Sequence, residues 1–259
     1  MTDTVLLERE GHLAHLILNR PQVLNAINNE LAEDLSAACE ALASDSDVWA
    51  VIFRGTGERA FSAGADLKAR REMSPEQWRA QRALFREMFD KLRGIAQPMI
   101  AAVHGYALGG GTELAMLADM IIAADDAVFG LTEVSLGIIP GGGGTQNLAR
   151  LIGRNRAKEL IFAARRIPAE EALWLGLVNR VVPRADLMTS AVAVAEEIMR
   201  NSPFAVRQAK WAIDHGVDLP LEQGFLREHE AYMLAIASED RREGIAAFNE
   251  KRRPNFTGR

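Results

Sequence analysis

Alternating apolar and polar residues open the chain and predict a β-hairpin, with strands over residues 5–9 and 12–18. Apolar residues then recur with the period of a helix over residues 28–43. Residues 49–53 form a short apolar run, which predicts a buried strand. The chain therefore begins with an alternation of strands and a helix.

A longer helix is expected before the next strand. Ser74 and Gln77 have the spacing of a capping box, with proline at the first helical position, and an apolar stripe continues the helix to about Arg93. Residues 98–103 and 120–124 are apolar runs that predict two further strands. This alternation is typical of α/β folds.

Helical patterns dominate after residue 144, where a strand is expected only over residues 177–182. The predicted helices cover residues 157–164, 168–175, 187–200, 203–213, 221–237 and 240–251. The expected fold class is therefore α/β, with strands concentrated in the front of the chain and helices alone at its end.

Composition narrows the class of protein. The chain has 259 residues, of which 48% are hydrophobic and 25% charged, so it can form one large domain or one domain with an appendage. A net charge of −5 gives no general attraction to nucleic acid or to anionic membranes. A single cysteine, Cys39, excludes an internal disulfide and fits a reducing compartment. The N-terminus lacks the pattern of a signal peptide, so a cytoplasmic protein without membrane contact is expected.

Two glycine clusters, each with a glutamate in apolar surroundings, concentrate the candidate chemistry between residues 104 and 146. The first cluster, residues 109–111, precedes a helix-like segment that contains Glu113, and Glu133 follows the next predicted strand. Glycine at a helix start lets another molecule approach free backbone N–H groups, which favour an anion or a carbonyl becoming one. Two such carboxylates can transfer protons. Taken singly, a glycine cluster also fits an ordinary turn, and a glutamate in the first turn of a helix also fits a helix-capping residue.

Other chemistries lack their motifs. The five histidines are scattered without metal-ligand spacing, so no metal site is expected. The chain has neither the G-x-S-x-G motif of a nucleophilic serine nor a phosphate-binding P-loop, and the glycine run 141–144 lacks the βαβ context of a dinucleotide site. A backbone anion site with two carboxylates remains, and it requires no cofactor.

Four ordered motifs resemble the enoyl-CoA hydratase (crotonase) superfamily, and the resemblance extends over essentially the whole chain. The motifs lie in residues 19–26, 61–68, 104–114 and 133–146. Residues 130–133, 157–162, 240–244 and 248–252 are most similar to the methylglutaconyl-CoA hydratase branch. The resemblance implies a crotonase-like spiral of β-β-α turns over residues 1–195. A helical trimerisation region over residues 196–259 would follow, giving a homotrimer or homohexamer.

The resemblance also implies the catalytic residues. The backbone N–H groups of Ala65 and Gly110 would form an oxyanion hole for the thioester oxygen of an acyl-CoA. Glu113 would act as the general base toward water, and Glu133 would deliver a proton to the α-carbon. Isomerases of the family usually keep only one of these carboxylates. Because both are present, hydration of the 2,3 double bond is expected, and isomerisation or another acyl-CoA reaction of the family is the alternative.

Residue-by-residue matching extends to substrate binding. The implied substrate-binding residues are Leu24, Ala63, Gly64, Asp66, Leu67, Lys68, Gly141, Phe248 and Lys251. Gly141 would lie near the acyl group, and Phe248 and Lys251 would reach the site partly from a neighbouring subunit. From the residues alone, Phe248 equally fits a core phenylalanine and Lys251 a solvated lysine.

The methylglutaconyl-CoA resemblance implies a substrate with a second carboxylate, which needs a cation. The candidates are Arg70, Arg71, Arg79 and Arg82. Each also fits an arginine exposed to solvent. One member of that branch binds RNA through a lysine-rich helix, but residues 21–53 here contain no lysine or arginine and six acidic residues, so no nucleic-acid partner is expected.

Overall fold

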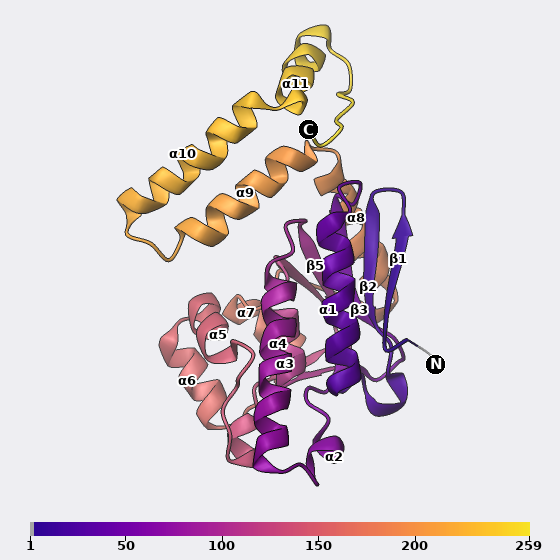
Figure 1. Ribbon diagram of the computed structural model, residues 1–259, viewed down its shortest axis with the longest axis vertical. Helices are drawn as coiled ribbons and strands as arrows, with labels where there is room; N and C mark the ends of the chain where they lie inside the picture. The colour runs from indigo at the N-terminus through magenta and orange to yellow at the C-terminus, as the bar shows by residue number, and fades with distance from the viewer. Residues whose placement is uncertain (1–2) are drawn as a thin grey trace.

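The computed structural model describes residues 3–259, which form two sheets covered by helices and a helical region that extends away from them (Figure 1). The first sheet has six strands. In spatial order these are β1 (Val5–Glu10), β2 (Leu13–Leu18), β3 (Ala50–Gly55), β5 (Met99–Val103), β7 (Met120–Ala124) and β10 (Arg180–Val182). The strands β1 and β2 are the predicted antiparallel hairpin, and the other neighbours are parallel.

A second sheet has four short strands. They are β4 (Ala60–Ser62), β6 (Tyr106–Leu108), β8 (Val128–Gly130) and β9 (Ile167–Pro168). The strands β3, β5 and β7 of the first sheet are followed along the chain by β4, β6 and β8 of the second. The chain thus passes through both sheets three times, which confirms the expected spiral within an α/β fold.

Helices cover both faces of the first sheet because its central strands β3, β5 and β7 carry apolar residues on both faces. Val51 and Phe53 of β3 face the larger core, under α1 (Asn29–Ser44) and α3 (Pro75–Arg93). Ala50 and Ile52 face the opposite side, where α8 (Leu187–Met199) packs. This alternation follows from the two-residue period of a strand. In Figure 1, α1 and α8 accordingly lie on opposite sides of β3.

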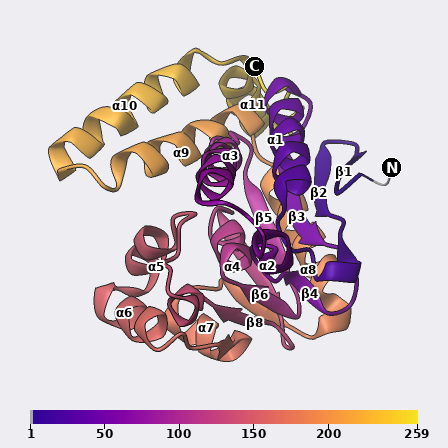
Figure 2. The ribbon, with the colours of Figure 1, turned by 60° about the horizontal axis from the view of Figure 1, so that its bottom comes forward.

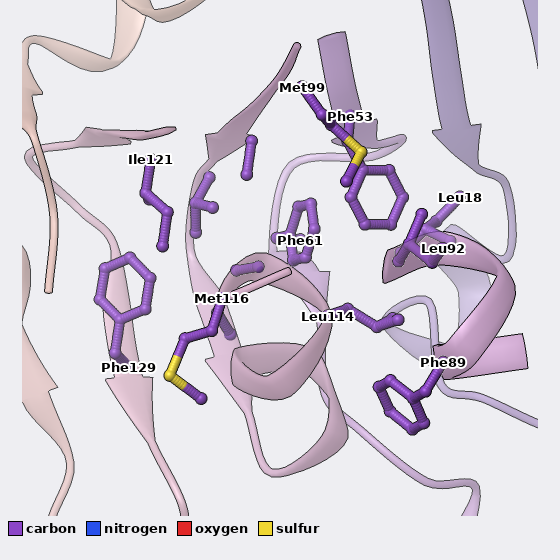
Figure 3. Packing of buried hydrophobic residues seen from close by; sticks show 14 of the residues in the cluster. Leu18, Phe53, Phe61, Phe89, Leu92, Met99, Leu114, Met116, Ile121 and Phe129 are labelled. Atoms are coloured by element: carbon purple, nitrogen blue, oxygen red, sulfur yellow. The ribbon is translucent and has the colours of Figure 1, made fainter. Parts of the chain in front are cut away.

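The larger core joins the second sheet to α3 and to the short helix α4 (Gly110–Ala115). Phe53 and Phe61 meet edge to face, with ring centroids 5.2 Å apart. Figure 3 shows Phe61, Leu114 and Phe89, from β4, α4 and α3, in this one cluster. Buried aromatic pairs of this kind hold neighbouring elements in a defined geometry. The helix α4 is therefore anchored in this core by Leu114 and Ala115 at its end.

The remaining helices lie around the second sheet and at the end of the chain. Near the second sheet are α2 (Leu67–Arg70), α5 (Gly144–Ile152), α6 (Arg154–Phe162) and α7 (Ala169–Leu175). The chain ends with α9 (Pro203–Gly216), α10 (Leu221–Ala237) and α11 (Glu239–Glu250). Figure 2 shows α2 and α4 on the side away from α10 and α11. The expected division after residue 195 falls within α8 and stays a prediction.

Most predicted elements are present, including the capping box, in which Gln77 N–H donates to Ser74 Oγ and Ser74 N–H to Gln77 Oε1. The sequence did not predict β4, β6, β8, β9, α2 or α5. The strand expected over residues 177–182 is shorter and begins at Arg180. The glycine cluster 109–111 was expected to follow β5 directly, but the strand β6 lies between them. Within residues 3–259, no helix combines the length and the apolar character needed to cross a bilayer.

Candidate active site

A cavity of about 650 Å³ lies where α2, α3 and α4 meet the loop that follows β8. Its apolar wall is formed by Ile27, Leu67, Trp78, Phe85, Phe89, Leu136, Ile138 and Ile139. Four charged residues, Arg70, Arg82, Glu113 and Glu133, also line it. An apolar cavity with a few convergent polar groups is the usual form of a small-molecule site.

Ala65 and Gly110 both line this cavity, and each has a backbone N–H group. Ile27 pairs with the segment on both sides of Ala65, accepting from Asp66 N–H at 2.9 Å and donating to Gly64 O at 2.8 Å. The N–H of Ala65 is left out of this pairing, and the N–H of Gly110 is the first of α4, where no earlier helical carbonyl exists. Within the described chain neither N–H donates a hydrogen bond, so both are available to a ligand.

Gly64 brings these two donors close together. Its φ of +84° is in the left-handed region that favours glycine. A Cβ at this position would lie 2.5 Å from Leu108 O and 3.0 Å from Gly110 N, so any side chain would push the two segments apart. The predicted pairing of Ala65 with Gly110 therefore has a local structural basis.

Glu113 projects from the first turn of α4 and is only 3% exposed. Its Oε1 accepts hydrogen bonds from Gly142 N–H at 2.7 Å and from Gly144 N–H at 2.8 Å. Burial raises the pKa of this carboxyl group, and the two N–H donors together with Arg82 oppose that rise. Its Oε2 accepts no hydrogen bond from residues 3–259, which leaves one oxygen for substrate or water.

The glycines of the second cluster are needed for this contact. A Cβ on Gly144 would lie 2.9 Å from Glu113 Oε1, and a Cβ on Gly142 would lie 2.3 Å from the ring of Phe89. Only residues without a side chain can bring their N–H groups so close to the carboxylate. The role of these two N–H groups was not predicted, although the glycine run itself was the signal.

Glu133 begins a short 3-10 helix, Glu133–Leu136, and lines the same cavity. Burial raises its pKa to about 7, and the charge of Glu113 adds to the rise. Its Oε2 is buried without a partner among the described residues. A Cβ on Gly109 would lie 3.2 Å from Glu133 Oε1, so this glycine makes room for the carboxyl group. The structure thus brings both predicted glutamates into one cavity.

The predicted substrate-binding residues divide into several groups. Ala63, Leu67 and Gly141 line the cavity, and Gly64 is buried behind it. The carbonyl of Leu24 accepts from Ala63 N–H at 2.9 Å, so Leu24 helps to position the loop. These five residues lie in the cavity wall or support it.

Asp66 and Lys68 lie at the edge of the same loop. Asp66 Oδ1 accepts from Ala69 N–H at 3.2 Å at the start of α2, and Oδ2 is 3.3 Å from Arg20 Nη1. Both contacts fix the loop, so the structure gives Asp66 a supporting position. Lys68 is exposed and is outside the cavity lining. Its contact with substrate stays a prediction.

Phe248 and Lys251 lie on α11 and at its end, at the opposite end of the molecule from α2 (Figure 1). Phe248 is 82% exposed, so the alternative of a core phenylalanine is wrong. Lys251 is exposed, as a solvated lysine would be. Neither residue lines the cavity of its own chain, and contact with the site of a neighbouring subunit stays a prediction.

The four candidate arginines are not equivalent. Arg70 and Arg82 line the cavity, so the alternative of a freely solvated side chain is wrong for both. Arg71 and Arg79 are exposed and are outside the lining. The structure therefore reduces four candidates to two.

The cavity has the parts needed for acid–base chemistry on a carbonyl compound. Ala65 and Gly110 present two N–H donors to a developing oxyanion. Glu113 and Glu133 present two carboxyl groups whose pKa values are both raised by burial. Pairs of this kind can serve as base and acid in one reaction.

Comparison with known proteins assigns the family. Residues 8–259 match the model of the family described as enoyl-CoA hydratase/isomerase, so the chain belongs to that family. It is 43% identical to the short-chain-enoyl-CoA hydratase of Clostridium acetobutylicum, over 97% of this chain and 96% of that protein. It is 41% identical to the crotonyl-CoA hydratase of Syntrophomonas wolfei, over 98% of each. A crystal structure of an enoyl-CoA hydratase from Bacillus anthracis matches with a TM-score of 0.96 and 44% identity, covering 99% of this chain and 100% of that one.

Proposed function

We propose that the protein hydrates short-chain 2-enoyl-CoA thioesters to 3-hydroxyacyl-CoA. One observation carries the proposal: two backbone N–H groups and two carboxyl groups line a single cavity, at Ala65, Gly110, Glu113 and Glu133. The names of the two hydratase relatives support the same reaction class. An isomerase needs only one proton-transferring carboxyl group, so the second favours water addition.

In the proposed mechanism, the thioester oxygen binds between the N–H groups of Ala65 and Gly110. Water attacks the β-carbon while Glu113 takes its proton, and the enolate oxygen is stabilised by the two N–H donors. The loss of one such donor typically costs about 3 to 4 kcal/mol of barrier. The oxyanion hole therefore depends on backbone geometry more than on side-chain identity.

Glu133 then protonates the α-carbon in this mechanism. The rise of its pKa to about 7 supports this role, because a large fraction of the carboxyl groups then holds a proton near neutral pH. After one turnover Glu113 is protonated and Glu133 is ionised. The proton has to return from Glu113 to Glu133 before the next cycle, and their shared cavity supports such an exchange.

The substrate class can be proposed in two steps. The relatives are named for short-chain enoyl-CoA and crotonyl-CoA, which supports a short acyl group. The resemblance to the methylglutaconyl-CoA hydratase branch adds 3-methylglutaconyl-CoA as a specific candidate. Its support on this chain is the pair of arginines, Arg70 and Arg82, in the cavity wall.

A steady-state comparison tests the proposal. Crotonyl-CoA, longer 2-enoyl-CoA esters and 3-methylglutaconyl-CoA are compared by the loss of conjugated enoyl-thioester absorbance. Hydration of crotonyl-CoA at a rate that depends on Glu113 and Glu133 is the expected result. Migration of the double bond of a 3-enoyl-CoA, without hydration of crotonyl-CoA, would favour an isomerase instead.

The family resemblance also leads us to propose a homotrimer or homohexamer assembled through α9, α10 and α11. Support comes from the apolar side chains that these helices expose. They include Ile213, Val217, Leu221, Phe225, Leu226, Tyr232, Met233, Leu234, Ile245 and Phe248. Exposed apolar area of this extent typically marks an interface. Sedimentation of the purified protein tests the assembly.

A further inference from the structure

We propose that the acyl cavity takes acyl groups that end in a carboxylate, with Arg70 as the cation that binds it. The inference rests on the proposed function in one respect: it treats the cavity beside Glu113 as the acyl site. It extends the one dicarboxylic candidate named above to dicarboxylic acid monothioesters as a class, and it assigns their selection to one residue.

Arg70 is a buried cation held with its charge toward the cavity. The residue is 9% exposed and lines the cavity wall. Its Nε donates to Gln81 Oε1 at 2.7 Å, and its guanidinium group lies 4.7 Å from the ring centroid of Trp78 and 5.4 Å from that of Phe85. Gln81 is in turn fixed by Asn29, whose Oδ1 accepts at 2.7 Å. These contacts fix the position of the guanidinium group through its Nε atom and one of its faces.

The two terminal nitrogen atoms of the Arg70 guanidinium group have no protein partner within the described residues. Among residues 3–259, Nη1 and Nη2 of Arg70 donate no hydrogen bond, and no carboxylate lies within the distance of an ion pair. Burial of an arginine without an anion is unfavourable. Here burial and the like charge of Arg82 both lower the pKa of Arg70, and a bound anion would relieve both effects.

The carboxylates of the protein do not meet this need. Glu113 is held by two backbone N–H groups, and Glu133, at the start of its short 3-10 helix, forms no ion pair with Arg70 within residues 3–259. Arg70 therefore lines the cavity as a buried cation without an anionic partner from residues 3–259. A carboxylate matches the planar donor geometry of a guanidinium group. An acyl chain that crosses the cavity would place its terminal carboxylate at Arg70.

Binding of saturated esters tests this inference without turnover. Glutaryl-CoA and pentanoyl-CoA have five-carbon acyl chains and differ in the terminal group, and neither has a double bond to hydrate. Calorimetry on the wild type is expected to show at least tenfold tighter binding of glutaryl-CoA. Arg70→Met, which keeps a similar apolar length, should reduce that ratio to below about threefold. Arg70→Lys should retain part of it.

Arg79→Met is the matched control, since Arg79 is exposed on the same helix as Trp78 and is outside the cavity lining. It should leave both affinities unchanged. Equal weakening of both esters in Arg70→Met would overturn the inference, because that result indicates a structural role in holding α2 against α3. Equal affinities in the wild type would overturn it even if no variant folded. A preference for glutaryl-CoA without any hydratase activity would instead contradict only the proposed function.

A separate contact leads us to infer that Arg82 is a positioning residue for Glu113. Arg82 Nη2 donates to the carbonyl oxygen of Gly141 at 2.7 Å. The N–H of the same peptide unit, on Gly142, donates to Glu113 Oε1 at 2.7 Å. A cation on the carbonyl oxygen polarises the peptide and strengthens its N–H as a donor. Arg82 thus acts on the carboxylate through one peptide group and also fixes the glycine loop.

The pH dependence of hydration distinguishes this role from support of the fold alone. The charged group that lowers the pKa of Glu113 is Arg82 from α3, and the other charged residues that line the cavity are Glu133 and Arg70. Removal of the Arg82 charge should raise the pKa of Glu113, so the acid limb of kcat/KM for crotonyl-CoA should move to higher pH. We expect a shift of about half a unit or more in Arg82→Met and a smaller one in Arg82→Lys. A lower rate with an unmoved acid limb would overturn the inference.

Discussion

Replacement of Glu133 by glutamine is expected to stabilise the folded protein above neutral pH while it removes most of the activity. Burial raises the pKa of Glu133 from 4.5 to about 7. At about 1.36 kcal/mol per pKa unit, this shift has an upper limit of about 3.4 kcal/mol. Because the residue is only half-buried, solvent screening reduces the expected gain to about 1 to 2 kcal/mol.

The sign follows from proton binding in the two states. The folded state holds the Glu133 proton more tightly than the unfolded state, so the stability of the wild type falls as pH rises from 4.5 to about 7. Below this window both states are protonated, and glutamine gives little gain. Above it the ionised carboxylate is buried in the folded state, and glutamine removes the full penalty.

Urea unfolding at pH 4.5 and at pH 8, at one protein concentration, measures the effect. The free energy of unfolding of Glu133→Gln should exceed that of the wild type by about 1 to 2 kcal/mol at pH 8 and by little at pH 4.5. Glu72→Gln, at an exposed position near the cavity, is the control and should show no such difference. An equal effect of Glu133→Gln at both pH values would refute a raised pKa.

Three further substitutions test the site. Glu113→Gln keeps an oxygen that can accept from the N–H groups of Gly142 and Gly144, but it cannot act as a base. The value of kcat should fall by a factor on the order of 10² to 10⁴, with little change in acyl-CoA affinity or in the free energy of unfolding. Near-normal turnover would exclude Glu113 as the base. Proline fits the first position of a helix but has no N–H, so Gly110→Pro should abolish turnover, whereas Gly110→Ala should only reduce it. A proline variant that folds and stays active would place the oxyanion hole elsewhere. Gly142→Ala forces a Cβ against Phe89 and should cost about 1 to 3 kcal/mol in urea unfolding, partly recovered by adding Phe89→Leu; no loss of stability would show that the loop can move.

The sequence predicted those elements that carry a clear period or a continuous apolar run. The hairpin, α1, α3 and the apolar strands β5 and β7 each carry such a signal. The strands β4, β6 and β8 have three residues each, too few to show alternation. The sheet that they form is a product of tertiary pairing. The helix α5 was missed because it starts at the end of the glycine run, which is typical of a loop.

The site was predictable in its residue types and less so in its contacts. The two glutamates and the two backbone donors follow from motifs, and the structure brings them into one cavity. The choice between Arg70 and Arg71 depends on which side of the four-residue helix α2 faces the cavity, and adjacent residues on a helix point in different directions. Gln81 is a polar residue in the apolar stripe of α3, and it was the available signal that a buried polar group, here the guanidinium group of Arg70, needed a hydrogen-bond partner.

Incorporation of solvent oxygen tests the central claim most directly. Purified protein is incubated with crotonyl-CoA in ¹⁸O-labelled water, and the product is analysed by mass spectrometry. The expected product is 3-hydroxybutyryl-CoA with one ¹⁸O atom in its hydroxyl group, formed rapidly by the wild type and about a hundredfold more slowly by Glu113→Gln. Unchanged crotonyl-CoA, or an isomer of the same mass without added oxygen, would contradict the claim.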